Sequence, residues 1–196
     1  MSLLKRIIFR FPTKGREARI VLLGPSGAGK TTLVRYLETG LPVEENPRTT
    51  MGIDIRKTPI LINGWSFKAV DLGGQELYQR TFWALAIEQA GAVVFVIDGT
   101  IRPKAKDSDQ FERSVFQFEY ALSLVSDEIP FLILVNKQDL SHLSPLSTRE
   151  ALTLYGIAKI QRNTLGVLPT SAKFGTGVQD AVEWLIHRVS EKRTNS

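Results

Sequence analysis

The chain has 196 residues, 43% of them apolar and 23% charged, which is typical of one globular domain. Its longest apolar run has only the length of a strand, so we expect no membrane-spanning segment. It has no cysteine, which excludes a disulfide framework and a thiolate zinc site, and its two histidines lie far apart, which leaves no histidine metal cluster. The net charge of +5 is confined to the first 16 residues, and the rest carries 20 basic against 20 acidic side chains. Because a nucleic-acid surface would spread positive charge over the fold, we expect no nucleic-acid partner. The lack of cysteine fits a reducing environment, so we expect a cytoplasmic protein.

The N-terminal arm, residues 1–15, combines apolar and basic side chains at helical spacing. On a helix the apolar side would contain Leu3, Leu4, Ile7, Ile8 and Phe11, with Lys5, Arg6 and Arg10 opposite. This pattern predicts a cationic amphipathic helix that ends before Pro12. The helix would either contact an anionic membrane weakly and reversibly or pack permanently on the domain as a strap, and both readings stay open. Ser2 is not a glycine, so we expect no N-myristoylation.

A phosphate-binding motif stands between a predicted strand at residues 20–23 and a predicted helix over residues 30–37. Residues 24–31 match the pattern G-x-x-x-x-G-K-[ST] in the strand and helix context that it requires. Glycines allow backbone N–H groups to converge on phosphate oxygens, Lys30 would reach the β- and γ-phosphates, and Thr31 would bind Mg²⁺. The predicted nucleotide contacts of this segment are Gly24, Ser26, Gly27, Ala28, Gly29, Lys30, Thr31 and Thr32.

Residues 40–51 are predicted to form a loop that brings a second hydroxyl to the metal. Thr49 and Thr50 are both candidates, and we prefer Thr50 as the ligand of Mg²⁺ and the γ-phosphate. Beyond the loop, strands at residues 53–62 and 65–72 flank Asn63-Gly64, which is a type I′ hairpin signal. One of these strands must therefore run antiparallel to its neighbour.

The segment after the hairpin is predicted to carry the hydrolytic groups. Asp71 at the end of its strand would hold Mg²⁺ through water, and Gly74 would donate its N–H to the γ-phosphate. Gln75 would orient the attacking water, which is the role of a glutamine in this class of reaction. The predicted catalytic residues are Gln75, Lys30 and Thr50, and the predicted metal ligands are Thr31, Thr50 and Asp71.

The rest of the chain alternates predicted strands with predicted helices. Strands are expected at residues 93–97, 131–135 and 167–168, and helices at residues 108–125, from Ser147 onward and at 176–189. Ser147 with Glu150 is typical of a capping box, which marks a helix start. The alternation predicts an α/β fold, with a mostly parallel sheet and helices on both faces.

Base selection is predicted from the loop after the strand at residues 131–135. Asp139, as a carboxylate, would accept hydrogen bonds from N1–H and the 2-amino group of guanine, which adenine does not offer. Lys137 would lay its aliphatic stem along the base, and Asn136 would tie this loop to its neighbours. Residues Ser171, Ala172 and Lys173 follow the next strand, where the Ala172 N–H would reach the guanine 6-oxygen.

With these motifs assembled, the chain resembles a small GTPase of the Ras superfamily and most closely the Arf and Arf-like family. The resemblance rests on residues 71–75, on Asn136 to Leu140 and on the Lys30-Thr31-Thr32 helix start, and it covers residues 16–190. It implies a phosphate-loop G domain with a six-stranded, mostly parallel sheet, one antiparallel strand and helices on both faces. We therefore divide the chain into the arm at residues 1–15, the G domain at 16–190 and a polar tail at 191–196.

The resemblance also implies an activity and partners. It implies a monomer that binds GTP and GDP with Mg²⁺, hydrolyses GTP slowly until an activating protein acts, and switches its loops around Thr50 and Gln75. Exchange factors and effectors are implied as further partners. The helix at the N-terminus would be released with GTP, which would place the GTP form at the cytoplasmic face of a membrane.

Other interpretations of the sequence remain. A phosphate-loop ATPase or nucleotide kinase would leave Asp139 without a match on adenine. A nucleotide-locked scaffold or receptor subunit with little turnover is not distinguished from a slow enzyme by sequence. Trp65, Phe82 and Trp83 would form either an effector patch or part of the core, and the two histidines are expected to face solvent.

Overall fold

The computed structural model describes residues 17–44, 53–55, 60–62, 65–72, 76–104 and 107–194. The strands are β1 (Glu17–Leu23), β2 (Ile53–Ile55), β3 (Ile60–Ile62), β4 (Trp65–Leu72), β5 (Ala92–Asp98), β6 (Phe131–Asn136) and β7 (Leu165–Pro169). The helices are α1 (Lys30–Thr39), α2 (Glu76–Ile87), α3 (Ser108–Leu124), α4 (Thr148–Leu154) and α5 (Val178–Thr194), with short 3₁₀ helices η2 (Ser141–Leu143) and η3 (Ile157–Lys159).

The strands form one mixed sheet in the order β2-β4-β1-β5-β6-β7, with β3 also paired to β4. Neighbouring strands from β4 to β7 are parallel, whereas β2 and β3 both run antiparallel to β4. The sequence predicts a single strand over residues 53–62. In the structure this segment forms two strands, β2 and β3, that both pair with β4. Ile55 pairs with Val70 and Ile60 pairs with Phe67, so five positions along the segment match only three along β4, and the two strands pair with β4 in different registers. The predicted mostly parallel α/β sheet with six strand positions is otherwise confirmed among the described residues.

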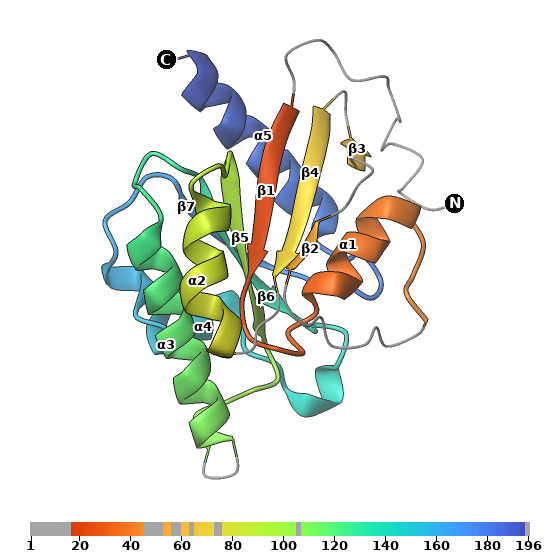
Figure 1. Cartoon of the computed structure of the whole chain (residues 1–196). Helices are drawn as coiled ribbons and strands as arrows, with labels where there is room; N and C mark the ends of the chain where they lie inside the picture. The colour runs from red at the N-terminus through yellow and green to blue at the C-terminus, as the bar shows by residue number, and fades with distance from the viewer. Residues whose placement is uncertain are drawn as a thin grey trace.

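Helices cover both faces of the sheet, as Figure 1 shows: α1 and α5 lie on one face, and α2, α3 and α4 lie on the other. Side chains alternate along each strand, so Ile20 and Leu22 of β1 join the core under α1 and α5, whereas Val21 and Leu23 join the other core. β5 and β6 are both interior strands of the sheet, and each is apolar up to its last residue because both of its faces are covered.

The helix boundaries follow local signals. Ser147 caps α4, and the reciprocal bonds between Ser147 and Glu150 form the predicted capping box. α5 runs to Thr194 and so extends beyond residue 189, where the sequence predicts its end. The helix α2 has no counterpart among the predicted elements. It contributes the fully buried Trp83 to the core beneath α2 and α3.

Candidate functional site

The loop between β1 and α1 adopts the backbone that a phosphate loop requires. Gly24, Gly27 and Gly29 have φ angles of 131°, 77° and 102°, which side chains rarely tolerate. At Gly29 there is also no space, since a Cβ would lie 2.2 Å from Nδ2 of Asn136. The glycines therefore serve both the turn and the close approach of the next loop, and the predicted strand-loop-helix context is confirmed.

Lys30 is buried over this loop, with 5% of its surface exposed. Its Nζ donates to the carbonyl oxygens of Gly24 and Pro25, both at 2.9 Å. Thr31 and Thr32 follow in the first turn of α1, which contains no acidic residue among its described side chains. A buried ammonium and the N-terminal end of a helix thus converge on one loop, which is an arrangement that favours an anion.

Asn136, at the end of β6, joins three loops of the site. It is 2% exposed, and its Nδ2 donates to the carbonyl oxygen of Ala28 at 2.7 Å. Its Oδ1 accepts from the backbone N–H of Ala172 at 2.8 Å and from the Thr170 hydroxyl at 3.4 Å. One amide therefore fixes the phosphate loop against the loop after β7, as the sequence predicts in outline for Asn136.

The Ala172 amide has a partner within the protein. The sequence predicts that the Ala172 N–H donates to the 6-oxygen of guanine, but in the structure it donates to Asn136. This bond connects the loop after β7 to Asn136 at the end of the neighbouring strand β6. Ala172 is 3% exposed and helps to hold the loops together, and its contact with the 6-oxygen of guanine stays a prediction.

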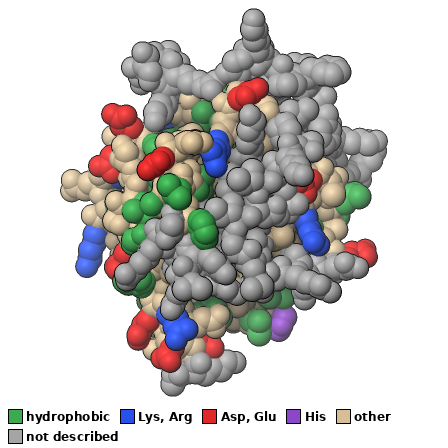
Figure 2. Space-filling model, viewed as in Figure 1, with side chains coloured by type: hydrophobic (Ala, Val, Ile, Leu, Met, Phe, Trp, Pro, Cys, Tyr) green, Lys and Arg blue, Asp and Glu red, His purple; other side chains and the backbone are tan. Residues whose placement is uncertain are grey.

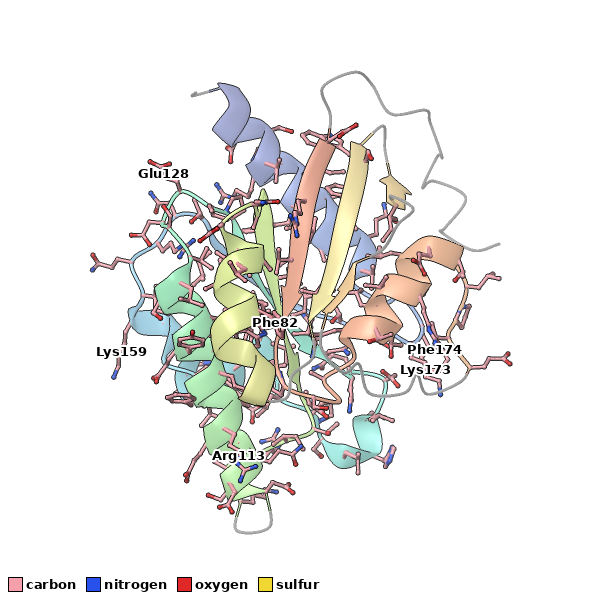
Figure 3. All side chains as sticks on the ribbon, viewed as in Figure 1. Phe82, Arg113, Glu128, Lys159, Lys173 and Phe174 are labelled. Atoms are coloured by element: carbon pink, nitrogen blue, oxygen red, sulfur yellow. The ribbon has the colours of Figure 1, made fainter. Side chains whose placement is uncertain are left out.

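The carboxylate predicted to read the base lies beside the same loop. Ser171 donates its hydroxyl to Oδ1 of Asp139 at 2.7 Å, and the Ser171 oxygen accepts the N–H of Phe174 at 3.2 Å. Asp139 retains its second oxygen and further lone pairs as acceptors. Lys173 and Phe174 lie beside the segment that follows α1, where Lys173 O accepts the N–H of Val43 (Figure 3).

Lys137 stands between Asn136 and Asp139 in a strained backbone conformation, with φ 65°. Its ammonium pairs with Asp98 at the end of β5, at 2.6 Å from Oδ2. The sequence predictions do not include Asp98 in the site. The available signal is its place at the carboxyl end of a central strand, where loops of an α/β sheet bind ligands.

Three predicted residues, Thr50, Gly74 and Gln75, lie outside the described residues. The backbone of Asp71 is described, and this residue pairs in register with Leu22 near the end of β1. Because β1 leads directly into the phosphate loop, the backbone of Asp71 lies at the same end of the sheet as the start of α1, where Thr31 stands. A carboxylate and a hydroxyl are hard oxygen donors, so the donor set fits Mg²⁺.

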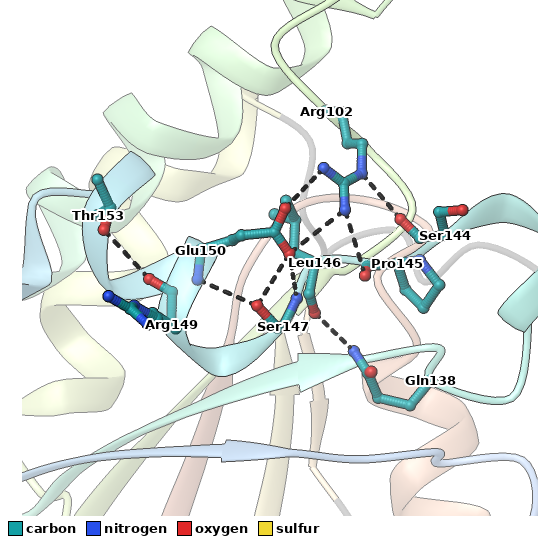
Figure 4. Close-up of polar contacts among 9 residues, drawn as sticks. All are labelled: Arg102, Gln138, Ser144, Pro145, Leu146, Ser147, Arg149, Glu150 and Thr153. Carbon is teal, nitrogen blue, oxygen red and sulfur yellow. Dashed lines mark hydrogen bonds and ion pairs between the residues drawn. The ribbon is translucent and has the colours of Figure 1, made fainter.

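A second polar network fixes the neighbouring loop, as Figure 4 shows. Arg102 donates to Glu150, to Ser144 O and to Pro145 O, which joins the segment after β5 to the start of α4. The bond from the backbone N–H of Ser147 and those from the Arg102 guanidinium lower the pKa of Glu150 to about 2. These contacts fix the start of α4 against the segment that follows β5.

The remaining candidates belong to the core or to the surface. Trp65 is 4% exposed and Trp83 is fully buried, so both pack in the core and do not form a surface patch, whereas Phe82 is partly buried. His142 and His187 are exposed, as predicted. In the described part of the face in Figure 2, acidic and basic side chains are interspersed. Within the described ranges no helix combines the length and apolar character needed to cross a bilayer.

Comparison with known proteins gives concordant results. Residues 4–189 match the model of the ADP-ribosylation factor family. The chain is 30% identical to ADP-ribosylation factor-like protein 1 of Caenorhabditis elegans, over 94% of this chain and 96% of that protein. It is 31% identical to ADP-ribosylation factor-like protein 3 of Chlamydomonas reinhardtii, over 90% and 93% respectively. The fold is similar to that of the Arl6 BBS3 small GTPase from Trypanosoma brucei with the bound nucleotide analogue GppNp. That comparison has a TM-score of 0.74 at 19% identity and covers 90% of this chain and 99% of that one.

Proposed function

Since this chain belongs to the ADP-ribosylation factor family of small GTPases, we propose that it binds guanine nucleotide with Mg²⁺, hydrolyses GTP to GDP and phosphate, and acts as a nucleotide-dependent switch at a membrane surface. The hydrolysis would be slow without an activating protein. An exchange factor and effectors would be its other partners, and the protein would act as a monomer.

The observation that carries this proposal is the position of Asn136. Its amide bonds hold the phosphate loop at Ala28 and the loop at Ala172 together, with Asp139 held beside them by Ser171. A ligand with phosphates on α1 and a base at Asp139 would therefore meet two preformed parts of one site. The carboxylate of Asp139 favours a base that presents two neighbouring donors, which guanine does and adenine does not.

The hydrolytic step would use groups on both sides of the γ-phosphate. Lys30, already buried over the loop, would neutralise charge on the β- and γ-phosphates, and Gln75 would orient the attacking water. Thr31, Thr50 and Asp71 would hold Mg²⁺. When bound, the metal stabilises the charge on the phosphate oxygens in the transition state.

The membrane part of the proposal rests on the sequence of the arm, which lies outside the described residues. Five apolar side chains opposite three basic ones suit an anionic cytoplasmic leaflet. Without a lipid chain such binding would be weak, reversible and sensitive to salt. The protein would therefore be cytoplasmic and would join the membrane mainly in its GTP form.

The proposal is tested by extracting nucleotide from the purified protein and then measuring GTP turnover. Guanine nucleotide is expected, and bound adenine nucleotide would contradict the proposal. Lys30→Ala should abolish tight GDP binding, whereas Gln75→Leu should slow hydrolysis and leave binding nearly intact. Asp139→Asn should weaken GDP and favour XDP, because its amide can donate to the xanthine 2-oxygen. Guanine nucleotide without any turnover would favour the scaffold reading.

The arm is tested with liposomes of anionic lipid. Protein loaded with a GTP analogue should co-sediment more than protein loaded with GDP. Deletion of residues 1–12, or Ile8→Glu, should remove that difference, because both changes remove apolar surface that the membrane would bury. Equal sedimentation of the two nucleotide forms, or sedimentation that the deletion leaves unchanged, would favour an arm that stays packed on the domain as a strap.

A further inference from the structure

Asp98 ends the central strand β5 and faces the base-reading loop. In the sheet register it stands opposite Asn136, the first residue of that loop. Its side chain is 13% exposed. Both of its oxygens are engaged: Oδ1 accepts the backbone N–H of Thr100 at 2.9 Å and the Thr100 hydroxyl at 2.7 Å, and Oδ2 accepts Nζ of Lys137 at 2.6 Å. The Asp98 carboxylate is thus fixed by Thr100 through one oxygen and binds the Lys137 ammonium through the other.

The backbone brings the two loops close enough for this pair. The N–H of Gly99 donates to the carbonyl oxygen of Asn136 at 3.0 Å. A Cβ on Gly99 would lie 2.6 Å from that same oxygen, so only glycine permits the approach. The backbone of Lys137 is also fixed within the turn. Its φ is 65°, and its carbonyl oxygen accepts the N–H of Leu140. The Asp98–Lys137 pair therefore connects two segments that are already docked.

The pair determines where the Lys137 stem can go. A lysine side chain is among the most costly to immobilise, and this one is 31% exposed. With Nζ held on Asp98, the methylene stem is restricted before any ligand arrives. Ordering a contact group in advance strengthens binding because the entropy is not lost on association.

We propose that Asp98 is a positioning residue for guanine nucleotide. It holds the Lys137 ammonium away from the base, so that the stem is preset as one wall of the base site. It also keeps that ammonium from Asp139, the carboxylate that reads the base two residues later. This inference rests on the proposed function, since it concerns the same site.

The test uses Asp98→Asn in the full chain. If its one oxygen stays as the acceptor for Thr100, asparagine presents an NH₂ group to the ammonium, so the ion pair is lost. We expect release of fluorescent GDP to become about tenfold faster. Single-turnover hydrolysis at saturating GTP should stay unchanged, because the base site is remote from the γ-phosphate. General damage to the fold would slow hydrolysis as well and would overturn the assignment.

A matched control is Asp109→Asn, which makes the same chemical change at an exposed position in the first turn of α3. Its GDP release should equal that of the wild type. Thr100→Val, which removes only the hydroxyl donor to Asp98, should give a smaller acceleration than Asp98→Asn. Equal release rates in the wild type and in Asp98→Asn would refute the proposal.

The route through Lys137 is tested by a double-mutant cycle with Lys137→Met, which keeps an apolar stem and removes the ammonium. In that background Asp98→Asn should change GDP release less than twofold. A full tenfold effect in both backgrounds would show that Asp98 acts by another route and would overturn the inference. If the wild type retains no guanine nucleotide at all, the proposed function fails, and this inference fails with it.

Discussion

Asn136→Ala removes a side chain that joins the phosphate loop to the loop after β7. The substitution deletes the donor to Ala28 O and the acceptor of Ala172 N–H, at 2.7 and 2.8 Å. Ala28 is 0% exposed and Ala172 is 3% exposed, so neither backbone group has direct access to bulk water as a substitute partner. The change therefore leaves two buried backbone groups without their partners, and the buried Thr170 hydroxyl also loses its longer bond of 3.4 Å to Asn136.

The expected cost follows from those two groups. A buried donor or acceptor left unpaired costs about 1–3 kcal/mol, so the pair should lower the free energy of unfolding by about 2–6 kcal/mol. Water that enters the space of the lost amide would move the value toward the lower limit. Domains of this kind have a total stability of about 5–15 kcal/mol, so the loss is a large fraction of the whole.

Urea unfolding without nucleotide, followed by far-UV circular dichroism, measures this free energy. Asn163→Ala is the matched control, because Asn163 is exposed in the turn before β7 and should change stability by less than about 0.5 kcal/mol. A loss below about 1 kcal/mol for Asn136→Ala would refute the reasoning. It would mean that the loops are held together by other contacts.

Three further changes test separate features of the structure. Gln117→Met should raise the free energy of unfolding, measured in urea, by about 1 kcal/mol, because the buried Oε1 of Gln117 has no hydrogen-bond partner among the described residues; a lower stability would contradict this. Glu150→Gln should lower the melting temperature most above pH 4.5. The pKa of Glu150 is lowered to about 2 by its bonds to Ser147 and Arg102, so its contribution is present above the unfolded pKa and is lost as the pH falls toward 2. A difference from wild type that does not shrink in acid would argue against this role. Gly29→Ala should lower the free energy of unfolding by more than about 1 kcal/mol, because φ is 102° and the new Cβ would lie 2.2 Å from Asn136 Nδ2. A variant as stable as the wild type would contradict this, and its crystal structure would show whether the loop has moved.

Features that depend on neighbours in the chain were predictable from the sequence. β4 occupies residues 65–72 as predicted, because a mostly alternating apolar and polar pattern with a turn signal before it needs no distant information. The capping box at Ser147 and Glu150 is likewise a local arrangement of two side chains three residues apart. The phosphate loop belongs to the same class, since its glycines encode a backbone path directly.

Features that join distant segments were decided only by the tertiary structure. Asn136 was predicted to tie loops together, but its choice of Ala28 and Ala172 as partners depends on how β6 lies between β5 and β7. For the same reason the bond from the Ala172 N–H to Asn136 could not be predicted from the sequence. The Asp98–Lys137 pair joins residues 39 positions apart. A sequence pattern shows which side chains follow a strand, but the packing of strands determines which of those side chains meet, because hydrogen bonds act only over about 3 Å.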